Sequence, residues 1–211
     1  MLCLGIDLCA SSKRASPLAL VNDEGSLIEL LAFKKYNDLL SIVERQNPNI
    51  IAIDVPLGLP LGLHCLEEAC PCAPANEHKG RVAEVELAQM GIGCFYTGKK
   101  SIIKSLIYRG IKFRQNLVHR GYSVIEVYPY ATKVMVFGDK IPSKGRPESL
   151  DHLREHLPTL VHGTEPYVNH LNHDQCDALL TAYTAYLHLK GETDSLGIPE
   201  EGLIQVPKPC Q

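Results

Sequence analysis

The segment 50–55 (IIAIDV) places the strongest constraint on the fold of this chain. Its apolar side chains occupy both alternating sets of positions, so an extended strand built from it is apolar on both faces. Such strands occur in the middle of parallel sheets, where helices cover both sides. The sequence therefore predicts an α/β fold with this strand near the centre of the sheet.

The elements expected around this strand define a fold by their order. Three apolar runs and a helix precede the strand, and helices enclosing a fifth strand follow it. The strands are expected at 2–8, 17–22, 26–32, 50–55 and 123–128, and the main helices at 36–46, 81–90, 101–120 and 174–190. Two shorter helical segments are expected at 131–137 and 147–157, and a short edge strand at 203–206. This order is that of an RNase H-like fold, a five-stranded mixed sheet in the order 3-2-1-4-5 flanked by helices.

Length and composition favour one compact domain. The chain has 211 residues, of which 45% are hydrophobic and 21% are charged, which suits a single RNase H-like domain over 1–211. Region 56–100 is expected to be an insertion after the fourth strand, because it begins with a stretch rich in Pro, Gly and Cys. No run approaches the roughly 18 apolar residues of a membrane span. The start lacks a basic segment and cleavage site, so we expect a cytoplasmic protein with no membrane partner.

Acidic residues stand at the ends of two strands that this fold makes neighbours. Asp7 ends the first strand and Asp54 ends the fourth. Parallel neighbours lie about 4.8 Å apart, and ligand sites in open α/β sheets gather where the strand connections diverge. Two carboxylates at this point repel each other unless a cation lies between them. The alternative is that each acid caps a loop independently.

Two more acids begin the last predicted helix. Asp174 and Asp177 are three residues apart, so they share one face of the helix and both interact favourably with its dipole. The apolar residues behind them would pack the helix on the sheet and direct the carboxylates toward Asp7. N-capping is an alternative role for Asp174, but it does not explain Asp177.

Glu126 lies between apolar residues on the fifth strand, and two interpretations of it stay open. It faces solvent at a sheet edge, or it reaches the acids as an outer ligand. Arg81, Glu84 and Glu86 precede the basic helix, where charged residues are ordinarily a helical surface.

Basic residues are concentrated in one segment although the net charge is −3. From Leu87 to Ile125 there is no Asp or Glu. A patch of this kind attracts polyphosphate, so nucleic acid, either DNA or RNA, is the expected partner. The alternative is a solvated helix face. The residues expected to contact phosphates are Lys99, Lys100, Lys104, Arg109 and Lys112.

Four of the eight cysteines fall in the insertion, namely Cys65, Cys70, Cys72 and Cys94. Four thiolates can hold Zn²⁺ or an iron-sulfur cluster, and His64 or His78 could replace one of them. The spacing is not that of common zinc ribbons. Small buried cysteines without metal are the alternative.

Several motifs together resemble a known family. They are G-I-D-L at 5–8, A-I-D-V-P-L-G at 52–58, R-V-A-E-V-E-L at 81–87, I-E-V-Y-P at 125–129 and H-D-Q-C-D-A-L at 173–179. In order and spacing they resemble the RNase H-like nuclease family catalogued as domain of unknown function 429. The last motif is also similar to the final catalytic helix of RuvC-type resolvases, in which acids on the first strand, the fourth strand and that helix bind the metal. The resemblance implies nuclease chemistry.

The expected activity is hydrolysis of phosphodiester bonds. Oxygen ligands suit Mg²⁺ or Mn²⁺, and two such ions about 3.5–4 Å apart, bridged by Asp7, would activate water and stabilise the leaving oxygen. A non-catalytic nucleic-acid-binding protein is the main alternative, and an actin-like nucleotide phosphohydrolase is a weaker one. A homodimer is possible, because resolution of a junction needs two sites.

Overall fold

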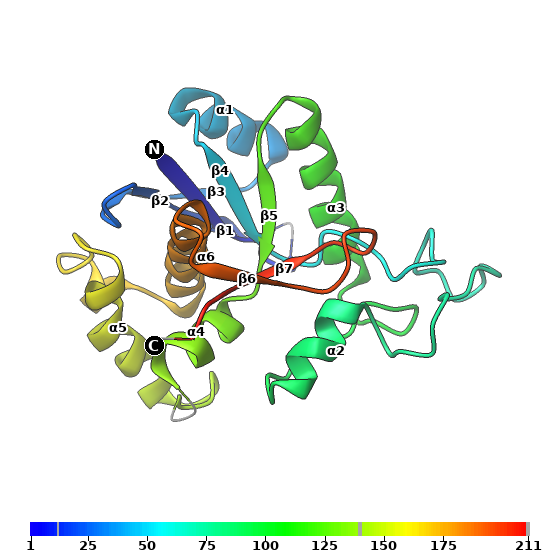
Figure 1. The fold of residues 1–211 in the computed structure, drawn as a ribbon. Helices are drawn as coiled ribbons and strands as arrows, with labels where there is room; N and C mark the ends of the chain where they lie inside the picture. The colour runs from blue at the N-terminus through cyan, green and yellow to red at the C-terminus, as the bar shows by residue number, and fades with distance from the viewer. Residues whose placement is uncertain (12, 139–140, 210–211) are drawn as a thin grey trace.

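A computed structural model describes residues 1–11, 13–138 and 141–209. Within these residues, strands form one mixed sheet with the order β3-β2-β1-β4-β5-β7-β6 (Figure 1). The strands are β1 (Leu2–Asp7), β2 (Ser16–Asn22), β3 (Leu27–Phe33), β4 (Ile50–Asp54), β5 (Val124–Val127), β6 (Thr193–Leu196) and β7 (Ile204–Pro207). The sheet has seven strands among the described residues, where the sequence predicts five.

The difference in strand number lies at one end of the sheet. The five expected strands keep the order 3-2-1-4-5. The segment expected as an edge strand, β7, instead pairs with β5 on one side and with β6 on the other. Strand β6 has the sequence TDSL and contains no buried residue. Its sequence lacks the apolar pattern that marks a strand. Its pairing with the apolar β7 places it in the sheet.

Helices cover both faces of the sheet (Figure 1). On one face, buried side chains of α1 and α3 pack against those of β1, β2 and β4. On the other face, α5 and α6 pack against β2, and α6 also contacts β1 and β4. The helices are α1 (Tyr36–Gln46), α2 (Val82–Gln89), α3 (Lys104–His119), α4 (Pro129–Phe137), α5 (Pro147–Leu160) and α6 (His173–Leu189), with a 3₁₀ turn η1 (Val168–His170).

A glycine allows α6 to lie very close to the sheet. Gly5 is in the middle of β1, and a Cβ atom at this position would overlap the backbone of Ala182. Ala178 and Ala182, which face the strand, are fully buried. Small residues on both elements therefore set the distance of α6 from β1, and with it the position of the acids at the start of the helix.

Asn172 caps the start of α6. Its side chain accepts a hydrogen bond of 2.9 Å from the backbone N–H of Gln175, and Gln175 Oε1 accepts one of 3.0 Å from the Asn172 N–H. This is a reciprocal capping box. Asp174 is therefore not the N-cap, and its carboxylate is left for other contacts.

Between β4 and α2 the chain forms a long irregular segment that extends away from the sheet, at the right of Figure 1. It contains the cysteine-rich part of region 56–100. Among the described residues, no helix is both long and apolar enough to cross a membrane.

Candidate carboxylate site

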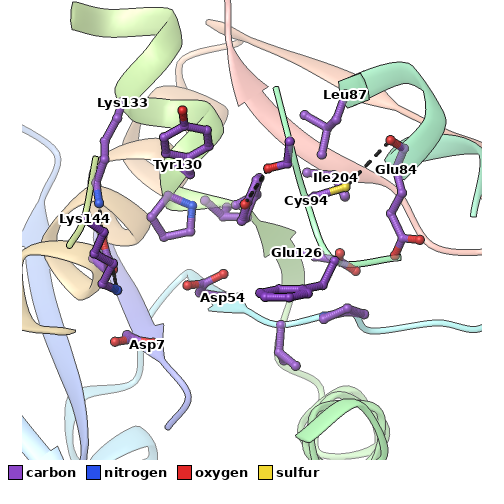
Figure 2. A pocket seen from close by; sticks show the side chains of 18 of the residues that line it. Asp7, Asp54, Glu84, Leu87, Cys94, Glu126, Tyr130, Lys133, Lys144 and Ile204 are labelled. Carbon is purple, nitrogen blue, oxygen red and sulfur yellow. Dashed lines mark hydrogen bonds and ion pairs between the residues drawn. The ribbon is translucent and has the colours of Figure 1, made fainter. Parts of the chain in front are cut away.

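Strand pairing places Asp7 and Asp54 side by side. β1 and β4 are parallel, and Asp7 is the register partner of Asp54 at their carboxyl ends. Both residues belong to the alternating set of positions that faces α6, because Ile6 and Ile53 belong to the core on the opposite face. Both side chains line one cavity (Figure 2).

The surroundings of this pair disfavour two negative charges. Burial raises the pKa of Asp7 to about 7, with repulsion from Asp177 and Asp174 adding to the effect and Lys144 and Lys133 opposing it. Burial also raises the pKa of Asp54 well above its usual value, and the charge of Asp7 adds to this shift. A divalent cation between the two carboxylates would remove the repulsion.

Neither carboxylate of this pair has a protein hydrogen-bond donor within the described part of the chain. Both residues are partly exposed, so their carboxylate oxygens are open to water or to a metal ion in the cavity. Oxygen ligands of this kind suit Mg²⁺ or Mn²⁺. The residues present therefore fit a hard divalent ion.

Two lysines hold Asp177 at the edge of the same cavity. Lys133 Nζ lies 2.5 Å from Asp177 Oδ1, and Lys144 Nζ lies 2.8 Å from Oδ2. Figure 2 shows both lysines on the side of the cavity that carries Asp7 and Asp54. Burial lowers the pKa of Lys144, but Asp177, Asp7 and Asp174 together hold it above its ordinary value. The cavity thus contains both carboxylates and ammonium groups.

Asp174 lies near the group but at its exposed side. Its carboxylate accepts a hydrogen bond from Arg14, whose side chain is largely exposed, and the Cys9 thiol lies 3.9 Å away. Within the described chain, no three of the four acids bring one carboxylate oxygen each within 4.8 Å of one another. Asp7, Asp54 and Asp177 line one cavity, while Asp177 pairs with lysines and Asp174 pairs with Arg14.

The cavity has a volume of about 540 Å³ and a mixed lining. Asp7, Asp54 and Asp177 lie in it together with Lys133 and Lys144. Its remaining surface is more apolar and includes the aromatic side chains Phe95, Tyr128 and Tyr130. A cavity with few converging polar groups in an apolar surface is typical of a ligand site.

Glu126 neither faces solvent nor contacts the acids at the strand ends, the two positions expected for it. It is buried, and it forms a bidentate ion pair with Arg81 at 2.5 and 2.8 Å, while the N–H of Leu57 donates to it at 2.7 Å. Its register partner is Ile53, so Glu126 belongs to the face of the sheet opposite to Asp54. Figure 2 shows it away from Asp7, toward Glu84.

Arg81 and Glu84 are core residues, so the expectation of a helical surface is wrong for them. Arg81 is completely buried and Glu84 is 2% exposed. Glu84 accepts hydrogen bonds from Arg81 Nε at 3.0 Å and from the N–H and hydroxyl of Thr97 at 2.7 and 2.6 Å. The Glu126–Arg81–Glu84 network therefore fastens the insertion to β5. All three residues also line the cavity, so the network forms part of its wall.

Three of the five basic residues expected to bind phosphate contact other groups of the protein itself. Lys99 donates to the carbonyl of Cys70, and Lys104 Nζ lies 3.5 Å from Glu68. Arg109 donates to the carbonyl of Cys9. Lys100 and Lys112 are exposed.

A second cavity, of about 350 Å³, lies on the other side of Leu8. Its charged lining is entirely basic and comprises Arg14, Lys34, Arg109 and Lys112. Arg109 Nε and the hydroxyl of Tyr36 are buried and have no hydrogen-bond partner among the residues that the structure describes. Because Leu8 lines both cavities, this basic cavity adjoins the acidic one.

Three cysteines of the insertion lie together with His64, and the fourth, Cys94, lies elsewhere. The potential ligand atoms of His64, Cys65, Cys70 and Cys72 all lie within 4.8 Å of one another. Cys94 is not among them, because its thiol lies against the backbone carbonyl of Glu84 at 3.7 Å (Figure 2). His64 thus takes the place expected for Cys94, and His78 lies outside the group.

Sequence reasoning missed Lys133 and Lys144. Lys133 had a usable signal, because it is the only charged residue in the apolar helix α4, which directly follows β5. A lone charge on such a helix needs a buried partner. Lys144 lies in an irregular segment before α5, and nothing in its surrounding sequence distinguishes it from an exposed lysine.

A family profile described as "Protein of unknown function (DUF429)" matches residues 5–202. The chain belongs to this family. The match covers most of the chain, including all four acids, and it confirms the resemblance seen in the motifs. Search of curated proteins gives no match to this DUF429 protein.

Among solved structures, the protein is similar to the one titled "Thermus thermophilus RuvC structure". The TM-score is 0.49 with 12% sequence identity, and the alignment covers 90% of this chain and 97% of the other.

Proposed function

We propose that this DUF429 protein is a metal-dependent phosphodiesterase that hydrolyses nucleic acid. The observation that carries the proposal is the register pair Asp7 and Asp54, whose carboxylates line one cavity and accept no hydrogen bond from a described protein group. Mg²⁺ or Mn²⁺ bound there would lower the pKa of a water molecule and stabilise the departing oxygen.

The other charged side chains have separate roles in this proposal. Asp7 and Asp54 are the central ligands, and Asp174 and Asp177 support them from the start of α6. The ammonium groups of Lys133 and Lys144 bind non-bridging oxygens of the phosphate. Lys144 is suited to this because 60% of its side chain is exposed, so it can turn from Asp177 toward a substrate.

The neighbouring surfaces suit a strand with unpaired bases. The basic cavity lined by Arg14, Arg109 and Lys112 would hold a phosphate flanking the one cleaved. Phe95 is 65% exposed and Tyr130 is 41% exposed, and both line the acidic cavity. Exposed aromatic rings beside cations favour single-stranded nucleic acid, because bases stack on them regardless of sequence.

Cleavage of labelled substrates tests the proposal. Single-stranded, duplex, hybrid and branched DNA and RNA are incubated with Mg²⁺ or Mn²⁺ and with EDTA. We expect metal-dependent cutting that favours unpaired strands. Asp7→Asn and Asp54→Asn should each lower the rate at least about 100-fold, because each removes a metal ligand. Asp194→Asn, which changes an exposed acid on β6, should keep the wild-type rate and controls for contaminating nuclease.

Three other results would each contradict the proposal in a defined way. Binding of nucleic acid that persists in EDTA, without cleavage of any substrate, would indicate a non-catalytic binding protein. Hydrolysis of free nucleotides without cutting of polynucleotides would indicate a nucleotide phosphohydrolase. Undiminished cutting by Asp7→Asn would remove the carboxylate pair as the catalytic centre.

A further inference from the structure

The insertion contains a second group of potential metal ligands, outside the carboxylate site. Cys65 Sγ and Cys72 Sγ are 4.0 Å apart, and Cys70 Sγ is 3.3 Å from His64 Nε2. A tetrahedral zinc ion with Zn–S bonds of about 2.3 Å and a Zn–N bond of about 2.0 Å has sulfur–sulfur edges of about 3.8 Å and sulfur–nitrogen edges of about 3.5 Å. The two measured separations bracket those values, so small side-chain shifts bring the four atoms onto one ion.

The chain around these residues has little else to give it a fixed shape. It contains no helix or strand between β4 and α2. In its cysteine-bearing part, residues 61–75, Leu66 is the one large apolar side chain that is fully buried. A segment with so little buried apolar surface does not offset the conformational entropy lost on ordering it. A metal ion that links its ligands supplies that free energy directly.

Contacts with the rest of the protein hold the backbone of this segment and do not involve the thiols. The N–H of Leu66 donates to the Tyr108 hydroxyl at 2.5 Å, and that hydroxyl lies 3.2 Å from Glu67. Lys99 donates to the Cys70 carbonyl. Thus α3 and the chain just before it hold the backbone, while the side chains of the four ligand residues converge on one another.

We propose that His64, Cys65, Cys70 and Cys72 bind one structural Zn²⁺ ion. Three thiolates and an imidazole fill all four positions of a tetrahedron, which is the arrangement of structural rather than catalytic zinc. Each thiol binds as a thiolate and releases its proton to solvent. An iron-sulfur cluster distributes its four ligands over at least two irons, and ligands on different irons lie farther apart than the 4.8 Å found here. The site is independent of the proposed nuclease activity.

Metal content measured by mass spectrometry tests this site. The full-length protein is produced with zinc in the medium, purified under reducing conditions without chelator, and passed through size exclusion. We expect one zinc per chain. Cys70→Ser and Cys72→Ser should each reduce zinc retention after dialysis at least tenfold. Cys94→Ser is the matched control, because this thiol lies in the same insertion but against Glu84; it should retain the full amount.

A spectroscopic measurement keeps the test decisive if the serine variants fail to fold. X-ray absorption at the zinc edge of the wild-type protein should fit three sulfur atoms and one nitrogen atom. Removal of zinc by a strong chelator should increase hydrogen exchange in 61–75 while the central sheet strands stay protected. Wild-type protein without bound zinc, iron in place of zinc, a Cys65–Cys72 disulfide in the reduced preparation, or loss of zinc in Cys94→Ser would overturn the proposal.

Discussion

Two basic side chains of this protein, those of Lys133 and Arg81, are buried. Lys133 is 6% exposed and Arg81 is completely buried, and each is neutralised by carboxylates that the fold brings from distant parts of the sequence. Lys133 contacts Asp177 of α6, and Arg81 contacts Glu126 of β5. Because a buried charge without its partner is strongly unfavourable, these pairs determine which substitutions near the cavity the protein tolerates.

The two lysines that bind Asp177 should differ in their effect on stability. Lys133→Met removes a buried partner and should lower the free energy of unfolding by about 2–3 kcal/mol. Lys144→Met removes a lysine whose side chain is 60% exposed, and should cost less than about 1 kcal/mol. Urea unfolding in EDTA measures both variants. Equal losses would contradict the assignment of Lys133 as the main partner of Asp177.

The Arg81 network should behave as a unit. Arg81→Met leaves Glu84 and Glu126 buried without their cation and should destabilise the protein by about 3–5 kcal/mol. Adding Glu84→Gln and Glu126→Gln removes the unpaired charges, so the triple variant should regain at least half of that loss. Thermal and urea unfolding compare the two variants. A triple variant no more stable than Arg81→Met would show that charge pairing is not the cause.

The sequence predicts the positions of some site residues better than those of others. Asp7 and Asp54 could be placed together because both end strands that are neighbours in the expected sheet. Glu126 could not be placed, because its contact with Arg81 depends on how the irregular insertion folds back onto β5. The sequence also could not show that His64, and not Cys94, joins the other three cysteines. The spacing of ligands in an irregular loop does not determine the path of the loop.

At the scale of elements, the close packing of α6 on β1 determines where the acids of the helix lie. The contact depends on Gly5, whose missing side chain gives room to the backbone at Ala182. The capping box of Asn172 and Gln175 fixes where the helix begins. Together they bring Asp174 and Asp177 to the carboxyl ends of β1 and β4.

Gly5→Ala tests this contact. The added methyl group overlaps backbone rather than a flexible side chain, so we expect a loss of at least about 2 kcal/mol from overpacking. Gly93→Ala is the matched control, because a Cβ there meets nothing within 4 Å. Differential scanning calorimetry should show a lower unfolding temperature for Gly5→Ala only. An unchanged temperature would mean that α6 does not approach β1 as closely as described.

Most elements could be predicted because their apolar patterns are strong. The run IIAIDV and the start of α6 are examples in which burial and periodicity agree. Strand β6 could not be predicted, since its residues Thr193–Leu196 have no apolar alternation and owe their conformation to pairing with β7. The pairing is a tertiary effect that local sequence does not contain.

For the whole molecule, charge is arranged around the point where the sheet connections diverge. The acidic cavity lies at the ends of β1 and β4, and the basic cavity adjoins it across Leu8. A protein with a net charge of −3 can therefore present a local attraction for phosphate beside a site for a divalent ion. Both features come from the sheet order, which brings residues from opposite ends of the chain together.

Mn²⁺ binding tests the central claim most directly, because it requires no knowledge of the substrate. Free Mn²⁺ is measured by electron paramagnetic resonance during titration of the wild-type protein and of Asp7→Asn, Asp54→Asn and Asp194→Asn. The account predicts saturable binding by the wild type and Asp194→Asn, and at least tenfold weaker binding by Asp7→Asn and Asp54→Asn, equivalent to about 1.4 kcal/mol. Absence of binding by the wild type, or equal affinity in all four proteins, would contradict it.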